Sequence, residues 1–204
     1  MRCRLRDVFS GLRFVYVLGL LVYLYHAADA GRRIMFEIVS DRLIPANAIA
    51  DERLRRLLEY WIALRGSRIL PSWSEAILSE LGEHLDRLHV LAYEGPGRFR
   101  FLRHGGGVTN PDVRDMTGLT TQDYRDKRFG GLVTRHYQEC SDRRVPIYRH
   151  VVARLSGEPY EFYRLILPLS DDGLRVNILL ASPGRITVPP SLPLPGEARG
   201  SSGS

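Results

Sequence analysis

The run His104-Gly105-Gly106-Gly107 has the composition of the oxyanion loop of some lipases and esterases. The backbone amides of such a loop stabilise a negatively charged oxygen, and they act beside a serine in a Gly-x-Ser-x-Gly turn. Residues 51–184 contain no such turn, and Gly200-Ser201-Ser202-Gly203 has the wrong spacing. A hydrolase triad cannot be assembled, so we predict that the protein has no catalytic residues and is not an enzyme.

Histidine and cysteine are the next candidates, because both bind metals. His136 and Cys140 stand four residues apart, which places them on one face of a helix, and His84 and His89 form a second pair. A zinc site needs three or four ligands, and no third ligand stands close in sequence to either pair. A helix histidine beside a buried thiol is the alternative interpretation. We therefore predict no metal site.

Aromatic side chains are concentrated on the strand-like segments, where they usually form core or cross-strand pairs. A concave sheet covered by short helices can nonetheless leave a pocket for a small apolar or aromatic molecule. The candidate pocket residues are Phe101, His104, Tyr148, His150 and Tyr163. Haem is an alternative occupant, with His104, His136 or His150 as its ligand. The sequence itself requires no cofactor.

Arg149, Arg154 and Arg164 lie on late strand-like segments and leave two interpretations open. They could bind an anionic group, or they could form a solvated face by ordinary strand alternation. The whole chain has a net charge of +6, but residues 51–184 hold 20 basic and 18 acidic residues. Nucleic-acid binding needs clustered cations, and here cations alternate with acids, so we expect no nucleic-acid partner.

The elements that must position these residues follow from hydrophobic periodicity. Alternation and bounding turn residues predict five strands, which are Leu88–Tyr93, Arg98–Phe101, Val145–Leu155, Tyr160–Leu169 and Leu174–Ser182. Gly130–Arg143 is expected to be a helix, and residues 71–88 are expected to be helical or irregular. Two strands, a helical middle and three strands predict an α+β domain with a five-stranded antiparallel sheet and helices on one face.

An amphipathic helix is expected ahead of this sheet, over residues 51–65. Asp51 is a suitable N-cap, Gly66 is a suitable stop, and apolar residues recur at helical spacing. The candidate interaction residues of this helix are Leu54, Leu57, Leu58 and Trp61. The stripe either packs on its own domain or pairs with a second copy, so a homodimer is a candidate assembly.

Asp115-Met116-Thr117-Gly118 predicts a tight turn, because the Asp115 and Thr117 side chains can bind nearby amides and Gly118 tolerates a positive φ. Thr120 and Asp123 have the spacing of a capping box for a short helix.

The two ends of the chain differ in composition from the body. Arginines precede the apolar run Phe14–Tyr25, and an Ala-x-Ala sequence follows it. Residues 1–34 are therefore a spurious extension upstream of a start at Met35, an export signal, or a membrane anchor. We expect residues 35–50 to be a linker, 51–184 the folded domain and 185–204 a disordered Pro/Gly/Ser-rich tail. A cytoplasmic location is expected unless residues 1–30 are a real signal.

The body resembles the compact, nearly stand-alone PAS-fold domains of alphaproteobacteria. The resemblance covers residues 54–182 and depends on the order and spacing of five segments. These are Leu58–Gly66, Leu70-Pro71-Ser72, Phe99-Arg100-Phe101, Asp115–Gly118 and Tyr163–Gly173. The chain departs from the family pattern at Trp73–Ile77, where an acidic segment is usual, and at Gly105–Gly107, where a single glycine is usual.

This resemblance implies a PAS-like fold and a regulatory function without catalysis. The domain would sense a small molecule, or dock onto a signalling partner such as a histidine kinase, or do both. A ligand-free adaptor for protein–protein interaction is the alternative.

Overall fold

Six antiparallel strands form the sheet on which the rest of the domain is built. The computed structural model describes residues 35–187, and within them the strand order is β1-β4-β5-β6-β2-β3. The strands are β1 (Phe36–Ile44), β2 (His89–Gly95), β3 (Arg98–Arg103), β4 (Ile147–Leu155), β5 (Glu158–Leu169) and β6 (Ile178–Thr187). The helices are α2 (Glu52–Arg65), α3 (Ala76–Glu80) and α4 (Lys127–Arg143), with 3₁₀ turns η1 (Ala46–Ala48), η2 (Gly82–Arg87) and η3 (Thr121–Asp123). The predicted α+β class and antiparallel sheet are confirmed.

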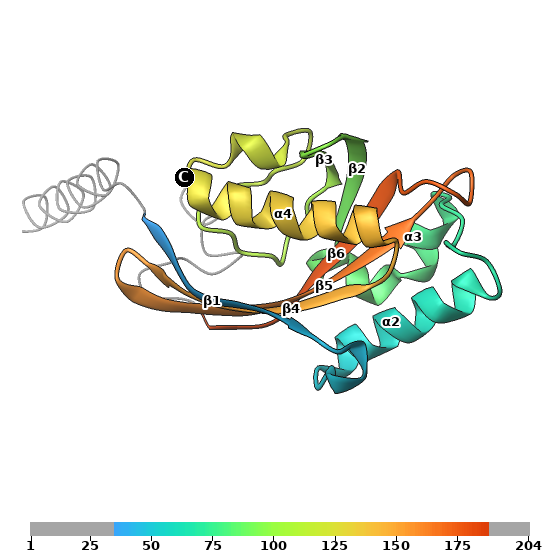
Figure 1. The fold of residues 1–204 in the computed structure, drawn as a ribbon, viewed down its shortest axis with the longest axis horizontal. Coiled ribbons are helices and arrows are strands. Elements are labelled where there is room, and N and C mark those ends of the chain that lie inside the picture. The colour runs from blue at the N-terminus through green and yellow to red at the C-terminus, as the bar shows by residue number, and fades with distance from the viewer. Residues whose placement is uncertain (1–34, 188–204) are drawn as a thin grey trace, which may run out of the picture. The chain divides into compact units, whose positions relative to one another are not determined.

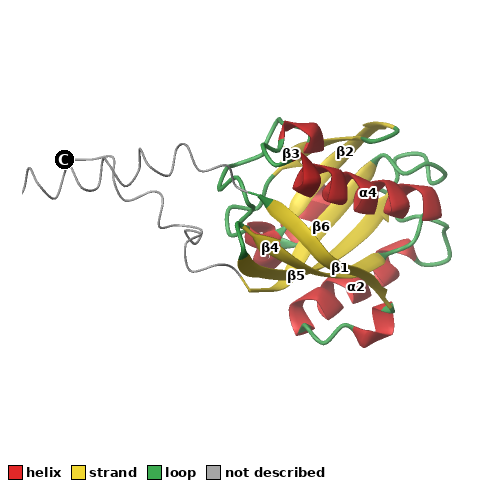
Figure 2. Cartoon of the chain, turned by 60° about the vertical axis from the view of Figure 1, so that its left-hand side comes forward, coloured by secondary structure: helices red, strands yellow, loops and turns green. Residues whose placement is uncertain are grey.

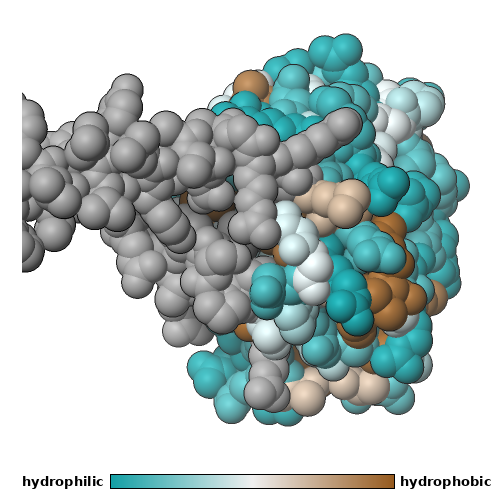
Figure 3. Space-filling view, turned by 90° about the vertical axis from the view of Figure 1, so that its left-hand side faces the viewer, coloured by the Kyte–Doolittle hydropathy of each residue, from teal (hydrophilic) through white to brown (hydrophobic). Residues whose placement is uncertain are grey.

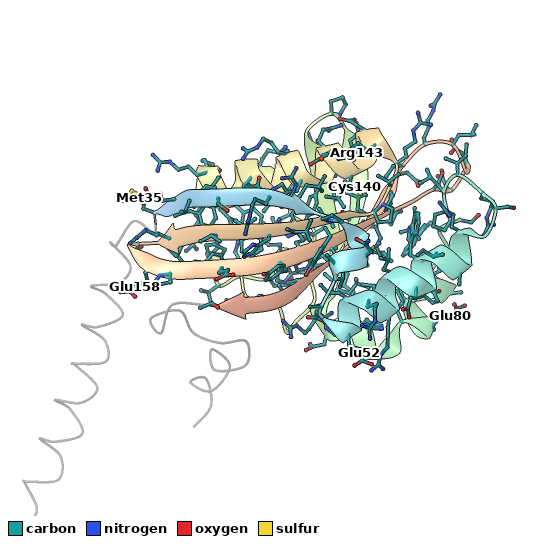
Figure 4. All side chains as sticks on the ribbon, turned by 60° about the horizontal axis from the view of Figure 1, so that its bottom comes forward. Met35, Glu52, Glu80, Cys140, Arg143 and Glu158 are labelled. Carbon is teal, nitrogen blue, oxygen red and sulfur yellow. The ribbon has the colours of Figure 1, made fainter. Side chains whose placement is uncertain are left out.

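Helices cover both faces of the sheet, which we call the α4 face and the α2 face after their main helices (Figures 1 and 2). In Figure 4, Cys140 and Arg143 of α4 lie across the sheet from Glu52 of α2 and Glu80 of α3. The prediction that helices cover one face only is wrong. β5 is buried without interruption from Arg164 to Leu169, and a strand with two apolar faces must be covered from both sides.

β1 is the strand that the sequence analysis did not predict. Residues 36–44, expected within a linker, pair antiparallel with β4 from Phe36 opposite Leu155 to Ile44 opposite Tyr148. The strand lies at the edge of the sheet, carries a bulge between Ile38 and Ser40, and has few buried residues. These features weaken the alternation that identifies a strand. The sheet therefore has six strands rather than five, and α2 does not precede it.

The helix expected over residues 51–65 is α2, and the Asp51 carboxylate accepts a hydrogen bond from Leu54 N at 3.1 Å. Its apolar stripe lies against the α2 face of its own sheet, and Trp61 Nε1 donates to Pro168 O at 2.8 Å. The buried members of the stripe are Leu54, Leu57, Leu58 and Trp61. These four side chains are consequently not free to contact another protein, which corrects their assignment as an interaction surface.

Two other boundaries differ from the prediction for local reasons. α4 begins at Lys127 rather than Gly130, because Asp126 caps it by accepting hydrogen bonds from Arg128 N and Phe129 N at 2.8 and 3.0 Å. β6 begins at Ile178 and runs to Thr187, beyond the expected end of the domain. The predictions for residues 1–34 and 188–204 concern parts of the chain outside the described residues. Within residues 35–187, no helix combines the length and apolar character needed to cross a membrane.

Replacing Leu57 by alanine is expected to lower the free energy of unfolding by about 2–5 kcal/mol, because the space left between α2 and the sheet refills only in part. Ile62 is 48 % exposed on the same helix, so Ile62→Ala should change it by less than about 1 kcal/mol. Denaturant unfolding followed by circular dichroism measures both. Equal losses in the two variants would contradict the packing of α2 described here.

Candidate functional site

The five predicted pocket residues lie on opposite faces of the sheet. Phe101 and His104 belong to the α4 face, with ring centroids 5.9 Å apart. Tyr148 and Tyr163 pack with the core of the α2 face, 5.7 Å apart, and His150 stacks on Tyr163 at 4.3 Å. The structure therefore does not bring the five together into one pocket.

The α2-face group is held by its own hydrogen bonds. His150 Nε2 lies 2.6 Å from Glu161 Oε1, and His150 Nδ1 lies 3.1 Å from Arg42 Nη2. Both ring nitrogens are thus occupied, and the ring is stacked face to face on Tyr163. This arrangement links β1, β4 and β5, and it leaves His150 no free nitrogen for a ligand such as haem.

The α4 face contains an arginine with no counter-charge. Arg164 of β5 is 9 % exposed, and its guanidinium lies over the rings of Tyr137 and Phe162, 5.7 and 4.9 Å from their centroids. Its Nη1 atom is fully buried and has no hydrogen-bond partner. No hydrogen bond or ion pair joins this guanidinium to any of residues 35–187. A buried charge without a partner is costly, so Arg164 is the strongest candidate for a binding residue.

Three buried tyrosines feel the charge of this guanidinium, and the ring of one of them, Tyr137, lies against it. Together with Arg164 and Phe162 they form what we call the Arg164 cluster. Burial raises the pKa of Tyr124, Tyr137 and Tyr160, while the positive charge of Arg164 opposes the rise in each. Their hydroxyls make no hydrogen bond to another described residue. The cluster therefore holds a guanidinium whose Nη1 atom is buried without a partner, together with phenolic hydroxyls that bond to no other described residue.

The neighbouring histidines do not add charge to this cluster at neutral pH. Burial lowers the pKa of His89 well below its ordinary value, and the nearby His104 and Arg164 lower it further. Burial likewise lowers the pKa of His104 and, despite the Asp41 hydrogen bond, that of His136 to about 4. Both lie on the α4 face as neutral rings, so Arg164 remains the cation of the cluster.

Arg149, on the neighbouring strand, is an arginine that does have ionic partners. It lies directly opposite Arg164 in the β4–β5 register, yet it donates to Asp41 Oδ1 at 3.0 Å and also pairs with Glu139 of α4. Asp41 Oδ2 in turn lies 3.0 Å from His136 Nε2. These contacts tie β1 to β4 and α4, and they leave the charge of Arg149 balanced. Arg154, the third arginine, is exposed.

The glycine run after His104 has a packing role. A Cβ on Gly105 would lie 2.6 Å from Asp86 O and 2.7 Å from Leu88 N, and one on Gly107 would lie 2.1 Å from Asp86 Oδ2. Gly107 N donates to Asp86 O at 2.8 Å. The run thus allows two backbone segments to meet closely. It also places His104 on His89, with ring centroids 4.3 Å apart.

The Asp115–Gly118 turn forms as its sequence predicts. Asp115 Oδ1 accepts hydrogen bonds from Thr117 N and Oγ1 at 2.8 and 2.7 Å, and Gly118 has a φ of +81°. Gly118 N donates to Phe101 O at 2.8 Å, so the turn is fastened to β3. The Thr120/Asp123 capping box is also present at η3. Both motifs position the loop that carries Tyr124.

The predicted metal candidates do not assemble. Within residues 35–187, no group of three or more histidine, cysteine or acidic side chains could hold a metal ion. The Cys140 thiol donates toward Val145 O and Ile166 O at 3.4 and 3.7 Å. Burial raises the pKa of this thiol well above its ordinary value, so it stays protonated. It therefore behaves as a core residue.

Comparison with known proteins adds no assignment, since the chain matches no family model, no curated protein and no solved structure.

Gly105→Ala is expected to destabilise the domain by about 1–3 kcal/mol, because the new methyl group meets backbone atoms of residues 86 and 88. Gly106→Ala is the matched control, since a Cβ there would lie 3.4 Å from a single Asp86 side-chain oxygen. Thermal unfolding of the two variants measures the difference. A Gly105 variant as stable as the Gly106 variant would show that the close approach does not exist.

The free energy of unfolding is expected to fall as the pH drops from about 6.5 to about 4. The folded-state pKa of His136 is lowered to about 4, so the unfolded chain takes up its proton first, and stability present above pH 6.5 is lost in this window. His136→Gln should reduce the loss by roughly 2 kcal/mol without removing it, because the buried His89 and His104 titrate in the same direction. Denaturant unfolding at pH 7.5 and 4.5 measures the change. Parallel pH profiles for the variant and the wild type would contradict it.

Proposed function

We propose that the domain is a non-catalytic regulatory module of the PAS type, which binds a small molecule between its sheet and α4. The observation that carries this proposal is the Arg164 cluster, in which the buried Nη1 atom of Arg164 lacks a partner among the described residues. Polar groups left unsatisfied in a core are costly, and a ligand that pairs with them removes that cost. Such convergent polar groups within an apolar, aromatic surrounding are typical of ligand sites.

The order of the strands supports the PAS-like part of the proposal. Apart from β1, the sheet has the order β3-β2-β6-β5-β4, so the first hairpin lies beside the last strand, as in PAS sheets. The segment between β3 and β4 supplies η3 and α4, which cover one face. The Arg164 cluster lies between the sheet and α4, which is where the proposed sensor would bind its ligand.

The bound state would reach a partner through β1 and α4. Arg164 is adjacent in the ladder to Arg149, whose contacts with Asp41 and Glu139 join β1 to α4. A ligand that pairs with Arg164 favours one arrangement of these two elements over another, which is a shift between existing populations. The partner class implied by the resemblance is a signalling protein such as a histidine kinase, or a second copy of the chain.

A ligand-free adaptor is the second candidate, and the exposed apolar side chains of β1 favour it. Val39 and Leu43 are 60 and 44 % exposed along this edge strand, and Met35, which directly precedes it, is 56 % exposed. An edge strand offers unpaired backbone groups to a partner strand. Figure 3, which views the end of the domain where β1 begins, shows a limited apolar patch bordered by hydrophilic residues. A modest docking surface of this kind could work without any small molecule.

Native mass spectrometry of the full chain, purified without added small molecules, separates the two candidates. The proposal predicts a reproducible non-covalent extra mass, or else a raised melting temperature with at least one compound from a panel of charged and neutral metabolites. A ligand that binds only the folded protein raises its melting temperature by several degrees when the ligand concentration is well above Kd. Denaturing mass spectrometry is the control, since it should return the bare chain mass. A bare chain that no compound stabilises would overturn the sensor and favour the adaptor.

A further inference from the structure

Building on the proposed ligand-binding function, we propose that the Arg164 cluster binds a small monocarboxylate. The binding residue is Arg164, Tyr137 lies against its guanidinium, and Phe162 forms part of the apolar wall. The ligand is a monoanion with a carboxylate at one end and a short apolar or aromatic body.

Charge balance sets the number of negative charges on the ligand. The cluster carries the single positive charge of Arg164, and Arg149, the nearest arginine in the ladder, is already balanced by Asp41 and Glu139. The buried histidines on this face are neutral at pH 7. One negative charge therefore neutralises the site, whereas a phosphate or sulfate dianion leaves a buried excess of negative charge.

Hydrogen-bond geometry selects a carboxylate among monoanions. A guanidinium presents parallel N–H donors that match the two oxygens of a carboxylate, and such bidentate pairs are strong and directional. Arg164 Nη1 is the buried donor that has no partner. The phenolic hydroxyl of Tyr137, the tyrosine that lies against this guanidinium, is a further donor, and burial keeps it protonated because burial raises its pKa. A halide ion accepts from these donors but does not use the planar geometry.

Ring contacts limit the size of the ligand. Phe129 lies 4.9 Å from Tyr124 and 6.4 Å from Phe162, and Tyr160 lies 5.5 Å from Phe162 between ring centroids. These distances are those of packed aromatic pairs, so the walls touch one another. The smallest aliphatic acids are therefore the ligands expected to bind best. The 9 % exposure of Arg164 shows that its side chain is not completely enclosed.

If Arg164 is a binding residue, its unpaired charge destabilises the protein when no ligand is bound. A structural arginine would instead stabilise it. Replacing a buried unpaired charge by an apolar side chain of similar length is neutral or stabilising. Arg164→Met should therefore melt at the same temperature as the wild type, or higher, in a buffer without small anions. A variant that melts well below the wild type there would show that the arginine is a structural residue, and this would overturn the proposal.

The test titrates the full chain with acetate, propionate and benzoate, and separately with phosphate, sulfate and chloride at matched ionic strength. Calorimetry and melting temperature are the readouts. We expect saturable binding of at least one carboxylate, with no comparable effect of the inorganic anions. Arg164→Met should weaken this binding at least tenfold. Arg154→Met is the matched control, because Arg154 is exposed on the adjacent strand, and it should bind as the wild type does.

The remaining outcomes separate this inference from the function on which it rests. Equal effects of chloride or phosphate would overturn the carboxylate assignment and indicate an adventitious ion only. Carboxylate binding that persists in Arg164→Met would show that Arg164 is not the binding residue, and this would overturn the proposed site. Binding of an uncharged molecule alone, abolished by Tyr137→Phe, would overturn the carboxylate while leaving the sensor function standing. No binding of any compound would overturn both.

Discussion

A positive charge without a counter-charge is buried on the central strand of this sheet, and the surrounding α4 face is arranged around it. Arg164 is stacked against the rings of Tyr137 and Phe162, which contributes about 1–2 kcal/mol of cation–π attraction. That is less than the several kcal/mol that taking a guanidinium out of water costs. The nearby histidines are neutral and the nearby carboxylates pair with Arg149, so neither offsets the remaining desolvation cost. An anionic ligand would close it.

The second constraint is that β5 is buried on both faces, and much of the fold follows from it. Leu165, Leu167 and Leu169 belong to the core beneath α2, whereas Phe162 and Arg164 face α4. The sequence Leu165-Ile166-Leu167 has no polar face, and it was the available sign that helices would be needed on both sides. The prediction of α2 succeeded because its capping residues and its helical apolar period agreed. The start of α4 was placed three residues too late, at Gly130 rather than Lys127, because its Asp126 cap was not recognised. β1 was missed because an edge strand with a bulge has neither a continuous apolar run nor strict alternation.

The site was harder to predict than the fold, since it depends on which residues share a face. Strand alternation places Tyr148 and His150 on one face of their own strand. The register between distant strands is needed to see that Phe101 lies on the opposite face of the sheet. Arg164 could have been favoured from its position two residues after Phe162 and four after Tyr160, in a series of inward-facing aromatics. What periodicity cannot give is the absence of a partner. The carboxylates that neutralise Arg149 come from β1 and α4, and only the folded structure shows that none reaches Arg164.

The most direct test of this account is an experimental structure of the full chain crystallised with acetate as the only small anion. The account predicts a planar carboxylate between β5 and α4, with its two oxygens within hydrogen-bond distance of the Arg164 guanidinium and a phenolic hydroxyl. A structure in which Arg164 turns to solvent, or pairs with a carboxylate of its own chain while no acetate is bound, would contradict it.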